Sequence, residues 1–245
     1  MLTISSMLPP GAKVRIRIER TPTTNALLAE RIDLRLAEHA QAEVFEVVPA
    51  HESALTLRHV RATLGSQAHL AWLSLDAGQK LARTSLDVLL QGESAGTQIR
   101  GISLLNGKSQ SHRRIQVFHE APHCHSDQFV RHMLQGTSQA SCASQVEILR
   151  GVKDSKAHQL INSLLLSRET KASAKPTLLI HNDAVEASHG TTCGELDAAQ
   201  LFYLKSRGLS DAEARRLLVT AFVLGMTDHA EFQSLSKTLL AQRFQ

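Results

Sequence analysis

The chain has 245 residues, of which 42% are hydrophobic and 20% charged, and this composition excludes a disordered protein. No apolar run approaches the roughly 20 residues of a membrane-spanning helix. The first residues lack the basic and apolar regions of a secretion signal, so we expect a cytoplasmic protein. A net charge of +4, with only seven Phe, one Tyr and one Trp, gives nucleic-acid binding no support.

The three cysteines are Cys124, Cys142 and Cys193. An odd and sparse set argues against a disulfide framework. No pair forms the Cys-x-x-Cys motif of common zinc and redox sites. The cysteines are therefore expected to be free thiols.

Short strands are predicted along most of the chain. Residues 14–18 and 32–36 alternate strictly between apolar and polar side chains, which is typical of a strand with one buried face. Further short apolar runs begin at Val44, Leu55, Leu70, Leu86, Gly101, Ile115, Val146 and Thr177.

Small polar clusters that begin with glycine separate these runs. Gly92 and Gly136 are 44 residues apart, as are Gly107 and Gly151. Glycine and small polar residues suit tight corners. Repeated strands with repeated corners predict a solenoid such as a parallel β-helix. A β-sandwich uses similar strands and remains the alternative.

The pattern becomes helical after Asp197, which is a predicted N-cap with Gln200 three residues later. Gly208 suits the end of this first helix. Ser210 and Glu213 predict the start of a second helix, and Asp228 with Glu231 predicts the start of a third. We therefore expect a β-helix core at residues 1–196 and a helical domain at residues 197–245.

Two enzyme motifs are incomplete. The segment 101–109 ends in Gly-Lys-Ser, but its first glycine is one position too early for a phosphate-binding loop and no helix follows. We read residues 106–107 as a tight turn. The chain also lacks the Gly-x-Ser-x-Gly motif of common hydrolases, so a Ser or Cys nucleophile has no recognisable context.

Two segments carry candidate metal ligands. His119, His123, Cys124 and His125 lie close together in sequence, and imidazole and thiolate bind transition metals, although the spacing fits no standard zinc finger. In the segment 185–197, His189 and Cys193 lie four residues apart. We read this second segment as the turn between the last strand and the first helix, and it also offers an imidazole and a thiol.

Residues 175–218 closely resemble the signature of the SufB/SufD family of iron–sulfur cluster assembly proteins, and SufD more than SufB. The resemblance covers about residues 100–225. The matching positions are Lys175, Pro176, Asp183, Val185, Ser188, His189, Gly190, Gly194, Asp197, Gln200, Phe202, Tyr203, Leu204, Ser206, Arg207 and Gly208.

The resemblance implies a right-handed parallel β-helix followed by a helical domain, and a scaffold without catalytic activity of its own. It implies a SufC-like ATPase as one partner and a SufB-like subunit, or a second copy, as another. His189 is then a cluster-assembly residue at the subunit interface, where an iron–sulfur cluster binds transiently. The ATPase is expected to bind around Gln200, Phe202, Tyr203, Arg207 and Gly208, and this chain is expected to bind no nucleotide.

The chain departs from the family pattern at specific positions. Ile161 occupies the place of the essential cysteine of SufB, and His189 follows SufD rather than SufB. Cys193 replaces an apolar residue, so it is an additional ligand or a core substitution. The alternative functions are a stand-alone His/Cys metal-binding solenoid, a metal-dependent hydrolase that uses residues 119–125, or a structural paralogue that binds no metal.

Overall fold

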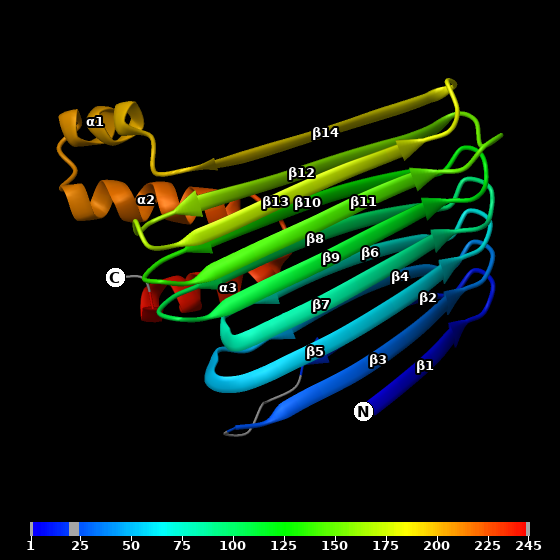
Figure 1. Cartoon of the computed structure of the whole chain (residues 1–245), viewed down its shortest axis with the longest axis horizontal. Coiled ribbons are helices and arrows are strands. Elements are labelled where there is room, and N and C mark those ends of the chain that lie inside the picture. Colours follow the sequence, from blue (N-terminus) through cyan, green and yellow to red (C-terminus); the bar gives the residue numbers. More distant parts are fainter. Residues whose placement is uncertain (1, 20–24, 244–245) are drawn as a thin grey trace.

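A computed structural model describes residues 2–19 and 25–243 and contains fourteen strands and three helices in these ranges (Figure 1). The strands are β1 (Leu2–Leu8), β2 (Lys13–Glu19), β3 (Leu27–Leu36), β4 (Gln41–Val48), β5 (His51–Leu64), β6 (His69–Asp76), β7 (Gln79–Leu90), β8 (Gly96–Leu105), β9 (Gln110–His119), β10 (His125–Leu134), β11 (Gln139–Ile148), β12 (Ser155–Leu165), β13 (Lys171–Ile180) and β14 (Val185–Gly194). The helices are α1 (Ala198–Ser206), α2 (Asp211–Leu224) and α3 (Ala230–Arg243).

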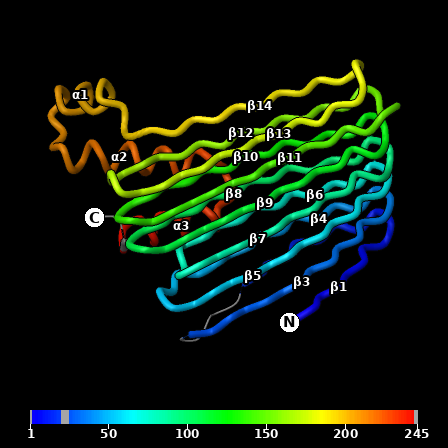
Figure 2. Tube along the Cα trace, viewed as in Figure 1, coloured from blue at the N-terminus to red at the C-terminus, as the bar shows by residue number. Residues whose placement is uncertain are grey.

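Successive strands alternate between two parallel sheets. The odd-numbered strands β1 to β13 form one sheet, and the even-numbered strands β2 to β14 form the other. Each coil therefore adds one strand to each sheet, and neighbouring coils stack from the N-terminus to β14 (Figure 2). This topology confirms the predicted parallel β-solenoid and excludes the β-sandwich, whose sheets are antiparallel.

The main core lies between the two sheets. Inward positions such as Val60, Leu86, Val117 and Val146 are fully or almost fully buried, as the period of two predicts. In-register partners lie about one coil apart in sequence, for example Val130 beside Ile161. The 44-residue glycine spacing thus connects opposite corners of the solenoid, because it spans about one and a half coils.

The reading of residues 185–197 as a turn was wrong. Val185–Gly194 is the full strand β14, which pairs in parallel with β12. The strands β10 and β12 were also not recognised from the sequence. Their inward faces carry polar residues, among them Gln128, His132 and Gln159, and these interrupt the apolar alternation that marks the other strands.

The helices follow β14, and two of them pack back on the outer face of the even-numbered sheet (Figure 1). Val223 of α2 and Phe232 of α3 join Leu75 and Leu104 of the sheet in a second apolar cluster. This cluster seals the C-terminal halves of the even strands. The division into domains 1–196 and 197–245 stays a proposal, and its boundary would fall between β14 and α1.

The helix starts agree in part with the sequence. Asp197 caps α1, and Ser210 and Glu213 form the predicted capping box of α2. The predicted cap of α3 at Asp228 is wrong. Instead, Nδ1 of His229 accepts the backbone N–H of Phe232, which places the imidazole at the N-cap position. No helix among the described residues is long and apolar enough to cross a membrane.

Candidate functional site

The terminal strand β14 lies at the open end of the solenoid. It forms a ladder with β12 on one side and ends the order of the even-numbered sheet. Val185 and Ala187 pack against the main core, so they define the inward face of the strand. Because side chains alternate, His189 and Cys193 belong to the same inward row. Both are exposed, because no further coil of the described chain covers this row.

The outer face of β14 fastens the strand to β12. Nδ1 of His158 and the Ser188 hydroxyl are 2.8 Å apart. Lys156 and Glu186 form an ion pair at 2.9 Å, and the Lys156 ammonium lowers the pKa of the Glu186 carboxyl. These contacts place β14 in one register although its inward row faces open space.

The two candidate ligands are not close enough to bind one ion together. His189 and Cys193 lie four residues apart on one strand face, which separates their Cα atoms by about 13 Å. Their in-register neighbours on β12 are Gln159 and Ser163, respectively. The strand therefore presents an imidazole and a thiol as two separate potential metal ligands along one edge.

Gln159 is a residue of this end that was not singled out from the sequence. It is fully buried, and its side-chain amide donates to the Ser144 hydroxyl at 2.8 Å. The signal that could have found it is the coil length, since Gln159 precedes His189 by one coil. Coil length becomes readable only when the pairing of strands is known.

The other histidine segment does not form a common site. His119 points into the core, where its Nε2 lies 2.8 Å from the Ser126 hydroxyl, and Cys124 is also buried. His123 lies at an exposed corner with φ of 59°. His125 is exposed on the outer face of β10, away from the core. Within the described residues, no three His, Cys, Asp or Glu side chains are grouped to hold a metal ion.

Burial makes the segment's inner side chains poor ligands in the folded chain. It lowers the pKa of His119 to about 4, with a smaller effect from His125, so this imidazole stays neutral. It also raises the pKa of the Cys124 thiol, which disfavours the thiolate form. The segment is therefore best understood as the corner and first part of β10.

The segment 106–109 is a corner of the solenoid, as the sequence predicts. Gly107 has φ of 62°, and its N–H is accepted by the side chain of Asn106 at 2.6 Å. Strand β9 follows immediately at Gln110, so no helix N-terminus is present to hold a phosphate.

Helix α1 stands beyond the end of β14 and buries none of its own residues (Figure 1). Phe202 is 75% exposed and Tyr203 is 56% exposed. The Arg207 guanidinium stacks over the Tyr203 ring at 5.3 Å, and Gly208 with φ of 95° ends the helix. Gln200 is exposed in the first turn, so the predicted ATPase-binding residues share one small uncovered helix.

Helix α2 continues this exposed surface. Leu217 is 48% exposed, whereas Val219 and Val223 pack against the sheet. The Arg131 guanidinium donates to the backbone carbonyl of Phe222 and lies between two aromatic rings. The outer half of the α1–α2 hairpin is thus free, while its inner half is anchored.

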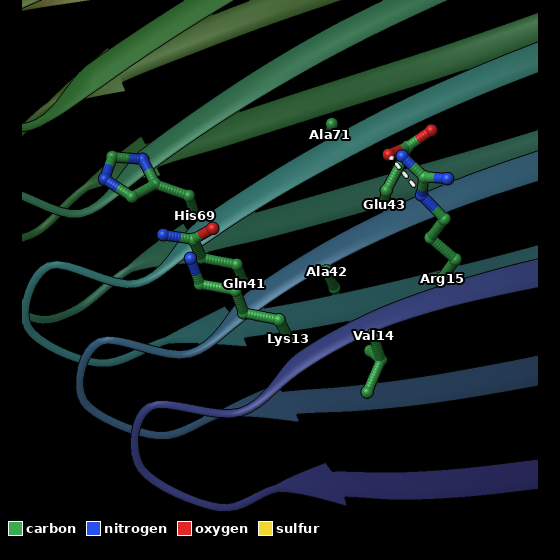
Figure 3. A pocket seen from close by; sticks show the side chains of 8 residues that line it. All are labelled: Lys13, Val14, Arg15, Gln41, Ala42, Glu43, His69 and Ala71. Carbon is green, nitrogen blue, oxygen red and sulfur yellow. Dashed lines mark hydrogen bonds and ion pairs between the residues drawn. The ribbon is translucent and has the colours of Figure 1, made fainter.

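An open groove of about 520 Å³ lies at the other end of the molecule (Figure 3). It follows the outer faces of β2, β4 and β6, and Arg15 and Glu43 form an ion pair beside it at 3.1 Å. Its lining residues are Lys13, Val14, Arg15, Gln41, Ala42, Glu43, His69 and Ala71. It contains none of the candidate residues of the sequence.

The family model for the SufBD core domain of SUF-system FeS cluster assembly matches residues 7–222. The chain belongs to the SufBD family. The match includes β14 with His189 and Cys193, and it extends through α1 into α2. The resemblance noted from the sequence is thereby confirmed.

Curated members of the SufBD family match most of this chain. A SufBD family iron–sulfur cluster assembly protein of Synechocystis sp. is 29% identical over 225 residues, which is 91% of this chain and 49% of that protein. The iron–sulfur cluster assembly protein SufD of Escherichia coli is 25% identical over 165 residues, or 67% of this chain and 39% of that protein. The chain thus spans about half or less of the length of these relatives and is SufD-like.

Proposed function

We propose that this chain is a scaffold subunit of SufD type that supports iron–sulfur cluster assembly and transfer. The observation that carries the proposal is the SufBD core match, which runs from the solenoid through the β14 end into the exposed helices. The relatives named SufD support the same assignment. The proposal treats residues 1–196 as the solenoid domain and residues 197–245 as the helical domain.

The proposed assembly site is the inward row of β14. His189 offers an imidazole and Cys193 a thiol, and both groups bind iron. Two such ligands hold a cluster less firmly than the four cysteines of a permanent iron–sulfur site, which suits transient binding. The free edge of β14 offers backbone groups to a further strand. We infer that a SufB-like subunit, or a second copy of this chain, pairs there and supplies the remaining ligands.

The proposed ATPase-binding surface is the outer side of the α1–α2 hairpin. Exposed aromatic side chains flanked by arginine are typical of the energetically important centre of a protein interface. Phe202, Tyr203 and Arg207 have this character, and α1 contacts too little of the solenoid to explain their presence. ATP hydrolysis belongs to the SufC-like partner, and this chain is not an enzyme.

The two proposed surfaces are adjacent along the chain. Only residues 195–197 separate β14 from α1. If the ATPase binds one arrangement of the hairpin better than another, it shifts the population of that arrangement and thereby the geometry of β14. We place this complex in the cytoplasm, where a reducing environment keeps Cys193 a thiol.

The proposal is tested by anaerobic reconstitution of the complex with both partners. His189→Ala is expected to reduce cluster formation, followed by absorbance of the cluster, without loss of the thermal transition. Thr191→Ala is the matched control, because Thr191 lies between His189 and Cys193 on the same exposed row. Normal cluster yield from His189→Ala would remove the imidazole from the proposed site.

A second experiment tests the ATPase surface. Tyr203→Ala is expected to abolish co-purification of the ATPase, since truncation of a central aromatic anchor commonly costs 2 kcal/mol or more. Thr192→Ala on the outer row of β14 is the control, and it should leave the complex intact. Retention of the ATPase by Tyr203→Ala together with Phe202→Ala would place the partner elsewhere.

A further inference from the structure

A polar network crosses the solenoid interior just below β14. The Ser144 hydroxyl on β11 donates to the side-chain carbonyl of Gln128 at 2.6 Å. The side-chain amide of Gln159 donates to the same hydroxyl at 2.8 Å. All three residues are at most 2% exposed, so water does not dominate their hydrogen bonding. The network therefore links β10, β11 and β12 inside the last coils.

The direction of these bonds leaves a free acceptor at the end nearest β14. The side-chain Nε2 of Gln159 donates to Ser144. The carbonyl oxygen Oε1 of the same side chain is buried and has no hydrogen-bond partner among the described residues. A buried polar atom without a partner costs about 1–3 kcal/mol. Such an atom in a folded protein indicates a partner that the surroundings can supply.

His189 is the donor that the fold places beside this acceptor. Gln128, Gln159 and His189 form one row across β10, β12 and β14, with Gln159 in register with both neighbours. Neighbouring strands lie about 4.8 Å apart, and both side chains belong to inward positions. The imidazole is exposed, so its side chain has room to turn one N–H group toward the Gln159 carbonyl.

The other histidine of this coil is already engaged. The His158 ring lies on the outer face of β12 and contacts the Ser188 hydroxyl. In the other direction, Gln128 Nε2 and Gln159 Oε1 are both unpartnered, because both amides turn toward Ser144 rather than toward each other. The Gln128 side chain is held with its carbonyl toward Ser144, so the exposed His189 is the neighbour whose N–H can turn to the Gln159 carbonyl.

We propose that Gln159 is the positioning residue of His189. Its side-chain carbonyl accepts one imidazole N–H, which selects the tautomer. The other ring nitrogen then carries the lone pair that is available to bind iron. Histidine ligands are commonly fixed in this way by a carbonyl or carboxylate behind them. The role of His189 as a ligand rests on the proposed function, whereas the hydrogen bond does not.

The hydrogen bond is tested by ¹⁵N NMR of the full chain, labelled at histidine, at a pH about two units above the ordinary pKa of histidine. His189→Ala identifies the signals. In wild type the neutral ring is expected to populate one tautomer. In Gln159→Met it is expected to populate both, so that its two ring-nitrogen shifts move toward each other. Gln159→Glu keeps an acceptor and is expected to retain the single tautomer.

Ser163→Ala is the matched control. Ser163 is also a buried inward residue of β12 with an unpartnered oxygen, but it lies beside Cys193 rather than His189. It is expected to leave the His189 signals unchanged. Identical tautomer ratios in wild type and Gln159→Met would overturn the proposal, as would a mixture of tautomers in wild type.

Cluster formation in the reconstituted complex separates this proposal from the proposed function. Loss of a residue that orients a metal ligand typically costs 10–100-fold. Gln159→Met is therefore expected to lower cluster yield about tenfold or more, and Gln159→Glu to restore it. If His189→Ala leaves cluster formation normal while the tautomer still follows residue 159, the proposed role of His189 in cluster assembly fails and the hydrogen bond stands.

Discussion

The interior of one solenoid contains polar residues of two different kinds. In the N-terminal coils, the buried Arg58 guanidinium binds both Glu30 and Glu46, and Glu46 also accepts the Trp72 N–H at 3.0 Å. Each charge of this cluster has an opposite charge beside it. These coils also bury Thr56, whose hydroxyl donates to the side-chain carbonyl of Gln79 at 2.7 Å.

The C-terminal coils contain neutral polar residues with open hydrogen-bonding capacity. Both ring nitrogens of the fully buried His132 lack a partner among the described residues. Four further neutral interior residues also have a buried atom without one, namely His119, Gln128, Gln159 and Ser163, as does Nε of the inward-facing Arg113. These residues lead directly to the exposed row of β14. Satisfied polar groups thus stabilise the N-terminal end, and unsatisfied ones accumulate beside the candidate site.

The largest effect expected of a single substitution comes from opening the closed cluster. Arg58→Met leaves two buried carboxylates without a cation and is expected to cost about 3–5 kcal/mol in the free energy of unfolding. Urea denaturation measures the loss. Arg61→Met, on the exposed face of the same strand, should remain within about 0.5 kcal/mol of wild type. Equal losses in both variants would show that the cluster does not stabilise the N-terminal coils.

Acid should destabilise the C-terminal coils next. Burial, assisted by nearby Arg113, lowers the pKa of His132 to about 3, and burial lowers that of His119 to about 4. The unfolded chain therefore binds these protons first. The free energy of unfolding is therefore unaffected by these two groups above about pH 6.5. As the pH drops toward 4, each histidine lowers it by about 1.4 kcal/mol per pH unit.

The measurement is the free energy of unfolding at several pH values between 7 and 4. His132→Leu removes one of the two protons taken up on unfolding, so its pH dependence should be shallower by that amount. Parallel curves for wild type and His132→Leu would mean that folding does not lower the pKa of His132.

A smaller loss is expected from Trp72→Phe. The variant removes the indole N–H that Glu46 accepts and keeps an aromatic ring in the core. Loss of a buried hydrogen bond to a charged acceptor costs about 1.5–3 kcal/mol. Repeating the change in the Arg58→Met background isolates the coupling between the two donors. Additive losses would show that the donors act independently.

The smallest effect is expected for His132→Leu at pH 7. The variant removes a buried polar side chain without protein partners, so stability should be unchanged or increase by about 1 kcal/mol. Thermal unfolding with wild type as reference is sufficient. A loss above about 2 kcal/mol would mean that His132 is satisfied in the folded chain, and the contrast between the two ends would be weaker than described.

The strands that the sequence predicts correctly are those with an apolar inward face. The alternation at residues 14–18 and 32–36 marks β2 and β3 because one face is buried among aliphatic side chains. The strands β10, β12 and β14 escaped this test since Gln128, Gln159 and His189 occupy inward positions. The polar inward residues that made these strands hard to predict are also the residues next to the candidate site.

Local chemistry also determined two helix starts. The side chains of Asp197 and Ser210 accept backbone N–H groups of their own first turns, so the signal is contained within four residues. The start of α3 was misassigned, because its cap is His229, whose ring also lies 3.1 Å from Glu43 and packs on Phe45 of the sheet. A cap that depends on a distant strand has no local signature.

The sequence by itself determined the period of two, the turn residues, the caps of α1 and α2, and the motif of the SufBD family, because each depends on neighbours in the chain. The tertiary structure decided the register, which brings Gln159 beside His189. It also buries His119 and leaves His125 exposed. It also decided which face the helices cover. Hydrogen bonding between strands one coil apart sets these contacts, and local alternation carries no information about coil length.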